Sequence, residues 1–140
     1  NVLAIASGVC DGLSLGLNAR ASLITRGMAE TVRLGVALGA EKDTFLGLAG
    51  AGDLFLTTTG ELSRNRKVGK EIASGVGLRE VLSNLGQVAE GVSNAPKLLS
   101  LGRALKVSLP ITREVCLLLD KKKDAREALN SLLKREPSDE

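Results

Sequence analysis

The sequence predicts a single all-α domain. Leu, Ala and Val occur 26, 15 and 11 times among the 140 residues, and Leu and Ala are strong helix formers. Aromatic residues, which strands favour, make up only 1% of the chain. Apolar residues recur at helical spacing along most of the sequence. A chain of this length can bury a core without help from a metal ion or a disulfide.

Two helices are predicted at the start of the chain. The first covers residues 1–13 and ends near Gly12. The second covers residues 19–38, with Asn18 as its N-cap and Gly39 at its end. Its expected apolar face consists of Leu23, Met28, Thr31, Leu34 and Leu38.

The second helix also carries a charged stripe. Arg26, Glu30 and Arg33 lie at positions i, i+4 and i+7, and this spacing brings opposite charges together on one side of a helix. The pattern predicts an ion-paired flank.

A glycine-dense segment follows the second helix. Asp43 is the expected cap of a short helix over 44–48, and the turn over 47–52 allows backbones to approach closely. Asp53 comes directly after the glycines at a good N-cap position, and Thr57 lies one helical turn later on the same face. A cap alone would explain the carboxylate. The alternative is a contact with a reacting hydroxyl or ammonium group.

Glycine and proline signals divide the rest of the chain into further helices. Ser63 is the expected cap of a basic helix over 64–72 that ends around Gly75. The remaining predicted helices are 78–84 before Gly86, 88–105 with a kink or break at Pro96, 111–119 after Pro110, and 125–134 capped by Asp124. We expect one helical domain over 1–136 and a polar tail over 137–140.

The composition excludes several kinds of chemistry. The chain has no His, so His-based catalysis and His-rich metal sites cannot form within it, and no metal site is expected. Cys10 and Cys116 lie far apart without C-x-x-C spacing, so we expect reduced core thiols in a cytoplasmic protein. No apolar stretch reaches the roughly 18 residues of a membrane span. The net charge of +3 is too mild for nucleic-acid binding, although a small anionic ligand is compatible with it.

The best candidate anion site is the start of the basic helix. A helix N-terminus offers unpaired N–H groups, and Arg64 adds two parallel donors for phosphate oxygens. A capped and solvated helix is the alternative. Glu90 is predicted as an exposed acid at a helix start, or as a contact to a cofactor held by a neighbouring domain. No G-x-G-x-x-G follows a strand, so the chain has no dinucleotide-binding fold of its own.

Five segments in one register carry a family resemblance. They are residues 1–8 (NVLAIASG), 23–27 (LITRG), 52–57 (GDLFLT), 63–66 (SRNR) and 87–91 (QVAEG). Together they resemble the bacterial-type NAD(P)-dependent glycerol-3-phosphate dehydrogenases, and the likeness extends to about residue 136. The resemblance implies an N-terminal Rossmann domain that holds NAD or NADP, and an all-helical C-terminal domain to which this chain is similar. It also implies the interconversion of dihydroxyacetone phosphate and sn-glycerol 3-phosphate by hydride transfer, which supplies the backbone of phospholipids.

The resemblance assigns expected roles to eight positions. Substrate contacts are expected at Asn1, Asp53, Thr57, Ser63, Arg64 and Asn65, and cofactor contacts at Arg64, Val88 and Glu90. The family's general acid is a lysine immediately before the position of Asn1, and Asp53 is expected to orient it. We therefore expect no catalytic residue within these 140 residues, and no activity of the chain by itself.

Two other functions remain open from the sequence. The chain is also compatible with the helical substrate or dimerisation domain of another two-domain NAD(P)-dependent dehydrogenase, or with a non-enzymatic module that binds an anion or dimerises. In the preferred interpretation the partners are the phosphate substrate, the protein's own Rossmann domain and, as an option, a second copy in a homodimer. The choice between NAD and NADP depends on ribose contacts in the Rossmann domain.

Overall fold

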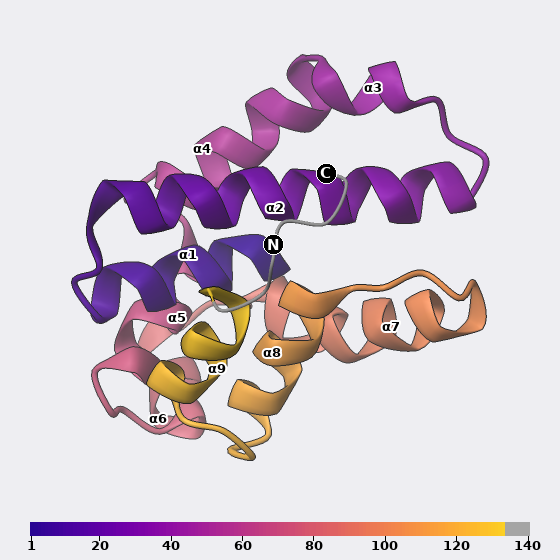
Figure 1. Cartoon of the computed structure of the whole chain (residues 1–140). Helices are drawn as coiled ribbons and strands as arrows, with labels where there is room; N and C mark the ends of the chain where they lie inside the picture. The colour runs from indigo at the N-terminus through magenta and orange to yellow at the C-terminus, as the bar shows by residue number, and fades with distance from the viewer. Residues whose placement is uncertain (134–140) are drawn as a thin grey trace.

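The computed structural model describes residues 1–133, which form nine α-helices and one short π-helical segment (Figure 1). The elements are α1 (Val2–Gly12), α2 (Gly16–Ala37), α3 (Lys42–Leu46), η1 (Leu48–Gly52), α4 (Asp53–Thr59), α5 (Arg64–Ala73), α6 (Leu78–Leu85), α7 (Glu90–Ala104), α8 (Pro110–Leu119) and α9 (Ala125–Leu133). No strand is found in this part of the chain. The all-α prediction is confirmed, whereas the predicted domain end at residue 136 and the tail over 137–140 lie outside the described residues.

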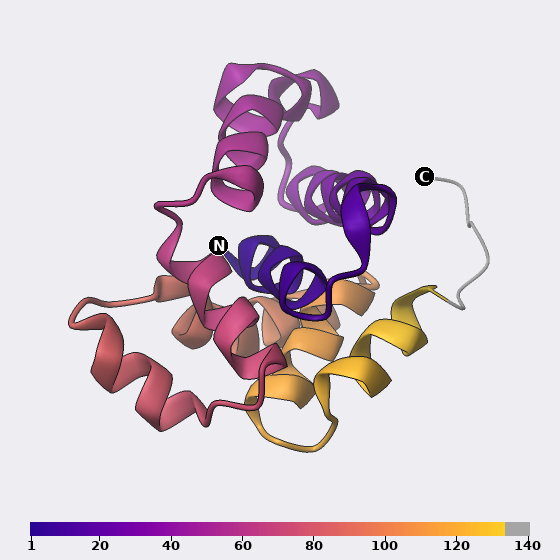
Figure 2. The same cartoon turned by 90° about the vertical axis from the view of Figure 1, so that its left-hand side faces the viewer.

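Helix α1 lies at the centre of the molecule. It contacts α2, α4, α5, α7, α8 and α9. Helix α2 runs antiparallel to α1 (Figure 1), and the arm formed by α3, η1 and α4 lies beside α2 on the same side of α1 (Figure 2). Helices α5 to α9 cover the opposite side of α1 (Figure 2). The first predicted helix is therefore the central element against which six of the other helices pack.

Two glycines allow the backbones of α1 and α5 to touch. A Cβ atom at Gly8 would overlap the carbonyl oxygen of Arg66, and a Cβ atom at Gly69 would overlap the carbonyl oxygen of Ile5. Each helix therefore presents a glycine to a carbonyl of the other. An ion pair reinforces the contact, since Arg66 Nε lies 2.7 Å from Asp11 Oδ2.

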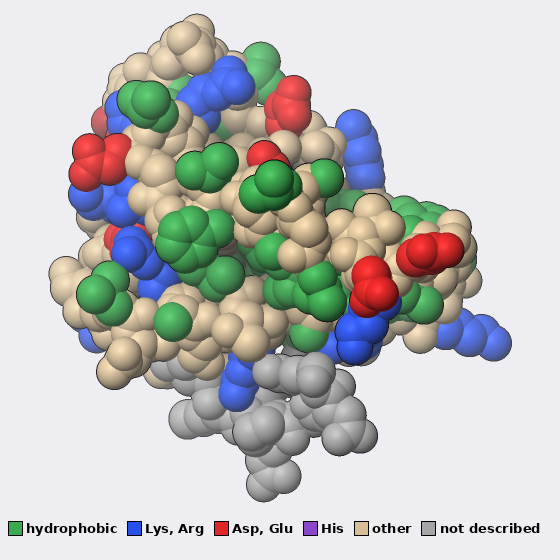
Figure 3. Space-filling view, turned by 90° about the horizontal axis from the view of Figure 1, so that it is seen from above, with side chains coloured by type: hydrophobic (Ala, Val, Ile, Leu, Met, Phe, Trp, Pro, Cys, Tyr) green, Lys and Arg blue, Asp and Glu red, His purple; other side chains and the backbone are tan. Residues whose placement is uncertain are grey.

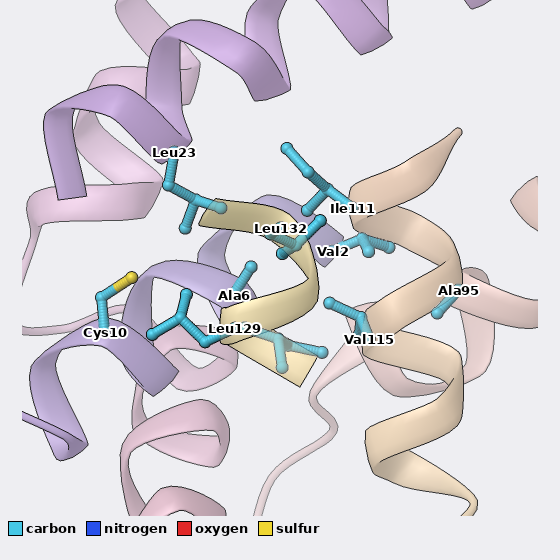
Figure 4. Close-up of a cluster of buried hydrophobic side chains, with 10 residues drawn as sticks. Val2, Ala6, Cys10, Leu23, Ala95, Ile111, Val115, Leu129 and Leu132 are labelled. Atoms are coloured by element: carbon cyan, nitrogen blue, oxygen red, sulfur yellow. The ribbon is translucent and has the colours of Figure 1, made fainter. Parts of the chain in front are cut away.

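The hydrophobic core is built around α1 and includes residues from α2, α7, α8 and α9 (Figure 4). Its buried members are Val2, Ile5, Ala6, Cys10, Leu23, Ala95, Ile111, Val115, Leu129 and Leu132. Cys10 is only 1% exposed, and burial raises the pKa of its thiol to about 11. Cys116 is half-buried against the same cluster, and both cysteines are free thiols, as expected.

The predicted ion-paired flank of α2 is wrong for Glu30. Glu30 is 3% exposed and connects α2 to the start of α8. Its carboxylate accepts hydrogen bonds from the backbone N–H of Ile111 at 2.8 Å, the backbone N–H of Thr112 at 3.0 Å and the Thr112 hydroxyl at 2.6 Å. The carboxylate satisfies N–H groups that have no partner within their own helix. Two residues of the predicted apolar face, Thr31 and Leu38, are instead exposed.

Two predicted N-caps of the first half are also wrong. Helix α2 begins at Gly16, because Ser14 (φ +54°) and Gly16 (φ +83°) complete the chain reversal before Asn18 is reached. Helix α3 begins at Lys42 after an extended Glu41, so Asp43 lies in its first turn. There the carboxylate still interacts favourably with the positive end of the helix dipole.

The glycine-dense segment is a π-helical turn that leads directly into α4. Gly52 already has helical dihedral angles (φ −63°, ψ −49°), so Asp53 is the first residue of α4 and does not act as its cap. A Cβ atom at Gly50 would overlap the carbonyl oxygen of Phe45, so this glycine lets the wide turn pack on α3. The predicted cap at Asp53 is therefore wrong.

The local signals of the second half are confirmed. The Ser63 hydroxyl accepts a hydrogen bond from the Arg66 N–H at 3.3 Å, and Pro110 is the first residue of α8. Asp124 and Glu127 form a reciprocal capping box, with the Glu127 N–H to Asp124 Oδ1 distance at 2.8 Å. Helix α7 begins at Glu90, two residues later than predicted, and continues through Pro96 as one helix.

Substitution of the contact glycines should destabilise the fold. Gly8→Ala and Gly69→Ala are each expected to lower the free energy of unfolding by about 3 kcal/mol or more, because the overlapped atoms belong to backbone. Gly77→Ala is the matched control, since no atom lies within 4 Å of its Cβ position and its φ is −68°. Its effect should stay within about 0.5 kcal/mol. Urea denaturation measures all three, and equal effects would refute the backbone contact.

Replacement of the buried carboxylate should also be costly. Glu30→Gln is expected to lower the free energy of unfolding by about 2–4 kcal/mol, because one of its oxygens becomes an NH2 that faces N–H donors. Glu71→Gln applies the same change to a surface pair, where Glu71 Oε1 lies 3.7 Å from Lys67 Nζ. That control should cost less than about 0.5 kcal/mol. Thermal denaturation of both variants tests this role of Glu30. Equal melting temperatures of Glu30→Gln and Glu71→Gln would contradict it.

Candidate functional site

A cavity of about 290 Å³ opens beside the start of α1. Its lining includes Asn1, Asp53 and Thr57, three of the predicted substrate residues, together with the buried Glu30. The start of α1, the end of α4 and the start of α5 lie on the same side of the molecule (Figure 2). The structure therefore joins residues from distant parts of the sequence at one opening.

A hydrogen-bond network connects the starts of three helices. Asn65 Nδ2 donates to Asn1 Oδ1 at 2.8 Å, and Asn65 Oδ1 accepts from the backbone N–H of Gly91 at 2.9 Å. Asn1 Nδ2 in turn donates to Glu90 Oε2 at 3.3 Å. These residues stand at the N-termini of α1, α5 and α7. The positive ends of three helix dipoles therefore converge on this network.

Close packing holds the network together. Asn65 is only 8% exposed. A Cβ atom at Gly91 would lie 2.8 Å from both the Asn1 carbonyl oxygen and Asn65 Oδ1. A larger residue at position 91 would separate the helix starts.

The start of α5 presents an exposed arginine beside this network. Ser63 accepts the Arg66 N–H as the helix cap, and Arg64 is the first helical residue. The Arg64 guanidinium donates to Gln87 Oε1 at 3.4 Å, in the loop before α7. Both the dipole and the guanidinium favour a negatively charged group here.

The carboxylates of Asp53 and Glu90 lie close enough to the backbone nitrogen of Asn1 to influence its charge. Burial lowers the pKa of the Asn1 amino group, and the negative charges of Asp53 and Glu90 oppose that shift. Thr57 lies one turn after Asp53 in α4, and its hydroxyl donates to the Asp53 carbonyl oxygen at 2.5 Å. Two carboxylates therefore lie close to the start of α1.

The predicted site residues fall into two connected groups. Asn1, Asp53 and Thr57 line the cavity, and Asn1 also hydrogen-bonds to Asn65 and Glu90. Three predicted residues belong to neither group. Ser63 caps α5, the exposed Arg64 donates to Gln87, and Val88 is 71% exposed in the loop before α7.

The predicted set omits three residues that the structure brings to this region: Glu30 in the cavity wall, the Gly91 N–H and the Gln87 side chain. A signal for Glu30 is present in the sequence, because it lies three residues after the buried Gly27 and seven after the buried Leu23. No comparable local signal marks the other two, since they depend on how α7 packs.

Neither a metal-binding cluster nor a membrane-spanning helix is found within residues 1–133. No group of three or more Cys, Asp or Glu side chains there could hold a metal ion. No helix in the same range has the length and apolar character needed to cross a bilayer.

Comparison with known proteins identifies close relatives. The sequence pattern of the family described as "NAD-dependent glycerol-3-phosphate dehydrogenase C-terminus" matches residues 1–130. The chain is 56% identical over 140 residues to a glycerol-3-phosphate dehydrogenase [NAD(P)+] of Cupriavidus pinatubonensis, and 59% identical to one of Polaromonas naphthalenivorans. In both comparisons it is covered completely and spans 40% of the relative's length.

Solved structures show the same fold. The crystal structure of glycerol-3-phosphate dehydrogenase from Coxiella burnetii matches 96% of this chain with a TM-score of 0.93 and 42% identity, and the match covers 41% of that protein. The enzyme from Saccharomyces cerevisiae matches 96% of the chain with a TM-score of 0.85 and 25% identity. By sequence pattern, identity and fold, the chain belongs to the family of C-terminal domains of NAD-dependent glycerol-3-phosphate dehydrogenases.

Proposed function

We propose that this chain is the substrate-binding domain of an enzyme that interconverts dihydroxyacetone phosphate and sn-glycerol 3-phosphate with NAD or NADP. The observation that carries the proposal is the convergence of three helix N-termini at Asn65, with the guanidinium of Arg64 beside them. A phosphate dianion is stabilised by helix N-termini and by arginine, and this region offers both. The names of the relatives support the choice of substrate.

The phosphate group is assigned to the start of α5. Arg64 provides a planar pair of donors, and its exposed position leaves them accessible to a ligand. Asn65 has a different role, because its amide is engaged by Asn1 and Gly91. It holds the helix starts in place. Ser63 likewise acts through the helix cap that it forms.

The carbonyl or hydroxyl end of the substrate is assigned to the cavity that contains Asp53 and Thr57. The family resemblance places a lysine immediately before Asn1, and Asn1 lines the same cavity as Asp53. A nearby carboxylate favours the charged form of a lysine and fixes its orientation. Asp53 would in this way keep the proton donor aimed at the substrate oxygen.

The cofactor is assigned to the neighbouring face. Glu90 and Arg64 lie at helix starts on the exposed side of the network, and Val88 presents an apolar side chain next to them. These residues offer a carboxylate, a cation and an apolar surface to a dinucleotide bound mainly by an N-terminal domain. The nicotinamide supplies the hydride, and the residues of this chain position the substrate relative to it. Two free cysteines are consistent with the proposed cytoplasmic location.

Removal of the arginine should weaken substrate binding. In the full-length protein that contains this chain, Arg64→Ala is expected to raise the KM for dihydroxyacetone phosphate and to reduce kcat/KM by the equivalent of about 2–4 kcal/mol. Arg79→Ala removes an exposed arginine of α6 and should leave both constants unchanged. NADH oxidation measures the rates.

The same assay separates the proposal from its rivals. An unchanged KM in Arg64→Ala would remove Arg64 from phosphate binding. Faster NADH oxidation with ketopantoate or an acyl-CoA than with dihydroxyacetone phosphate would favour another dehydrogenase. No NAD(P)-linked reaction at all would favour a non-enzymatic binding module.

Neutralisation of Asp53 should affect turnover more than folding. Asp53→Asn is expected to lower kcat by at least about tenfold, because the carboxylate that orients the proton donor is lost. Its melting temperature should change little, since Asp53 is exposed. Asp43→Asn provides a control with the same change in the first turn of α3. Normal turnover in Asp53→Asn would exclude Asp53 from the mechanism.

A further inference from the structure

A second and larger hollow lies along a neighbouring face of α2. It is a groove of about 1010 Å³ between α2, the α3–α4 arm and the loop after α7. Its lining consists of Ile24, Thr25, Met28, Ala29, Val32, Arg33, Val36, Ala37, Lys42, Leu46, Ala51, Leu54, Phe55, Lys106, Val107 and Ser108. None of the predicted substrate or cofactor residues belongs to this groove, so its apolar surface has no role in the proposed reaction.

All the charged side chains that line the groove are positive. Arg33, Lys42 and Lys106 line it, and no Asp or Glu does. Within residues 1–133, Arg33 Nε is the buried side-chain nitrogen or oxygen that has no hydrogen-bond partner. A buried polar group without a partner is costly, and an anion at this position would remove that cost.

The surface around the groove carries charges of both signs. Viewed from the side of the α3–α4 arm, hydrophobic side chains gather across the middle of the face, with Lys and Arg as well as Asp and Glu side chains around them (Figure 3). Phe55 and Leu46 remain 62% and 57% exposed. On α2 the lining extends from Ile24 to Ala37, which at about 1.5 Å per residue corresponds to roughly 20 Å. The apolar strip is thus long, and its polar lining groups include three cations.

We propose that this groove binds the carboxylate of a long-chain fatty acid. The acyl chain would lie along the apolar side chains of α2 and the α3–α4 arm, and the carboxylate would accept hydrogen bonds from Arg33. A second copy of the chain is disfavoured as the occupant, because a two-fold contact of this surface with itself would bring the three cations against their equivalents. The proposal does not rest on the function proposed above.

Two side chains connect this site with the substrate cavity. Met28 and Leu54 line both the groove and the cavity that contains Asp53 and Thr57. A bound acyl chain would therefore touch the wall of the substrate cavity from its other side. A ligand in the groove would therefore affect the substrate cavity through the side chains of Met28 and Leu54.

The single methionine of the chain provides a direct probe. When the 140-residue chain is labelled with 13C at the Met methyl group, its one methionine NMR signal belongs to Met28. Titration with dodecanoate, below its micelle concentration, should shift this signal in a saturable manner with one ligand per chain. Dodecyltrimethylammonium has the same tail and the opposite charge, and should bind at least about tenfold more weakly because the groove is cationic.

Variants separate the contributions of head and tail. Arg33→Gln should weaken dodecanoate binding at least about tenfold, whereas Lys97→Gln, an exposed cation of α7 outside the groove, should not change it. Ala29→Phe fills the groove without a change in charge and should abolish the shift. The melting temperature of each variant shows whether it folds. If Arg33→Gln does not fold, Ala29→Phe still tests the proposal.

Three outcomes would overturn the proposal. They are equal binding of the anionic and cationic amphiphiles, dodecanoate binding by Ala29→Phe that matches the unmodified chain, and a Met28 signal that shifts with protein concentration alone. The last result would show that a second copy occupies the groove.

Discussion

The contact between the backbones of α1 and α5 is the constraint on which the rest of the structure depends. Gly8 and Gly69 face carbonyl groups of the opposite helix, so the two axes approach more closely than side chains would allow. Because Asn1 and Asn65 stand at the starts of these helices, the same contact brings their side chains within 2.8 Å. The geometry of the candidate site is thus a consequence of helix packing several residues away.

Two adjacent faces of helix α2 line two hollows of the molecule. The first face lines the cavity near Asn1, and its Glu30 binds the start of α8. The second face forms the floor of the cationic groove. Met28 belongs to both. A buried carboxylate that ties two helices together keeps this shared wall in place, since its three hydrogen bonds leave α2 and α8 little freedom to move apart.

The predictions succeeded where the signal was local. The cap at Ser63, the proline at the start of α8 and the capping box of Asp124 each depend on residues within a few positions of one another. They failed where packing overrode the local preference. Asp53 is a good cap by type, but the π-helical turn that packs on Phe45 carries the chain into α4 without an interruption. The spacing of Glu30 from Gly27 and Leu23 places it on the buried face of α2, but its hydrogen-bond partners are known only once α8 packs against it.

The sequence by itself determined the all-α class, most helix positions and the membership of the family, because helix propensity, caps and short motifs are properties of neighbouring residues. Only the tertiary structure decided which residues share a site. The hydrogen bond between Asn1 and Asn65 spans 64 positions, and the bond between Glu30 and Thr112 spans 82. Such pairs form because glycines permit close helix contacts and because buried polar groups must find partners, and no local pattern specifies which partner that is.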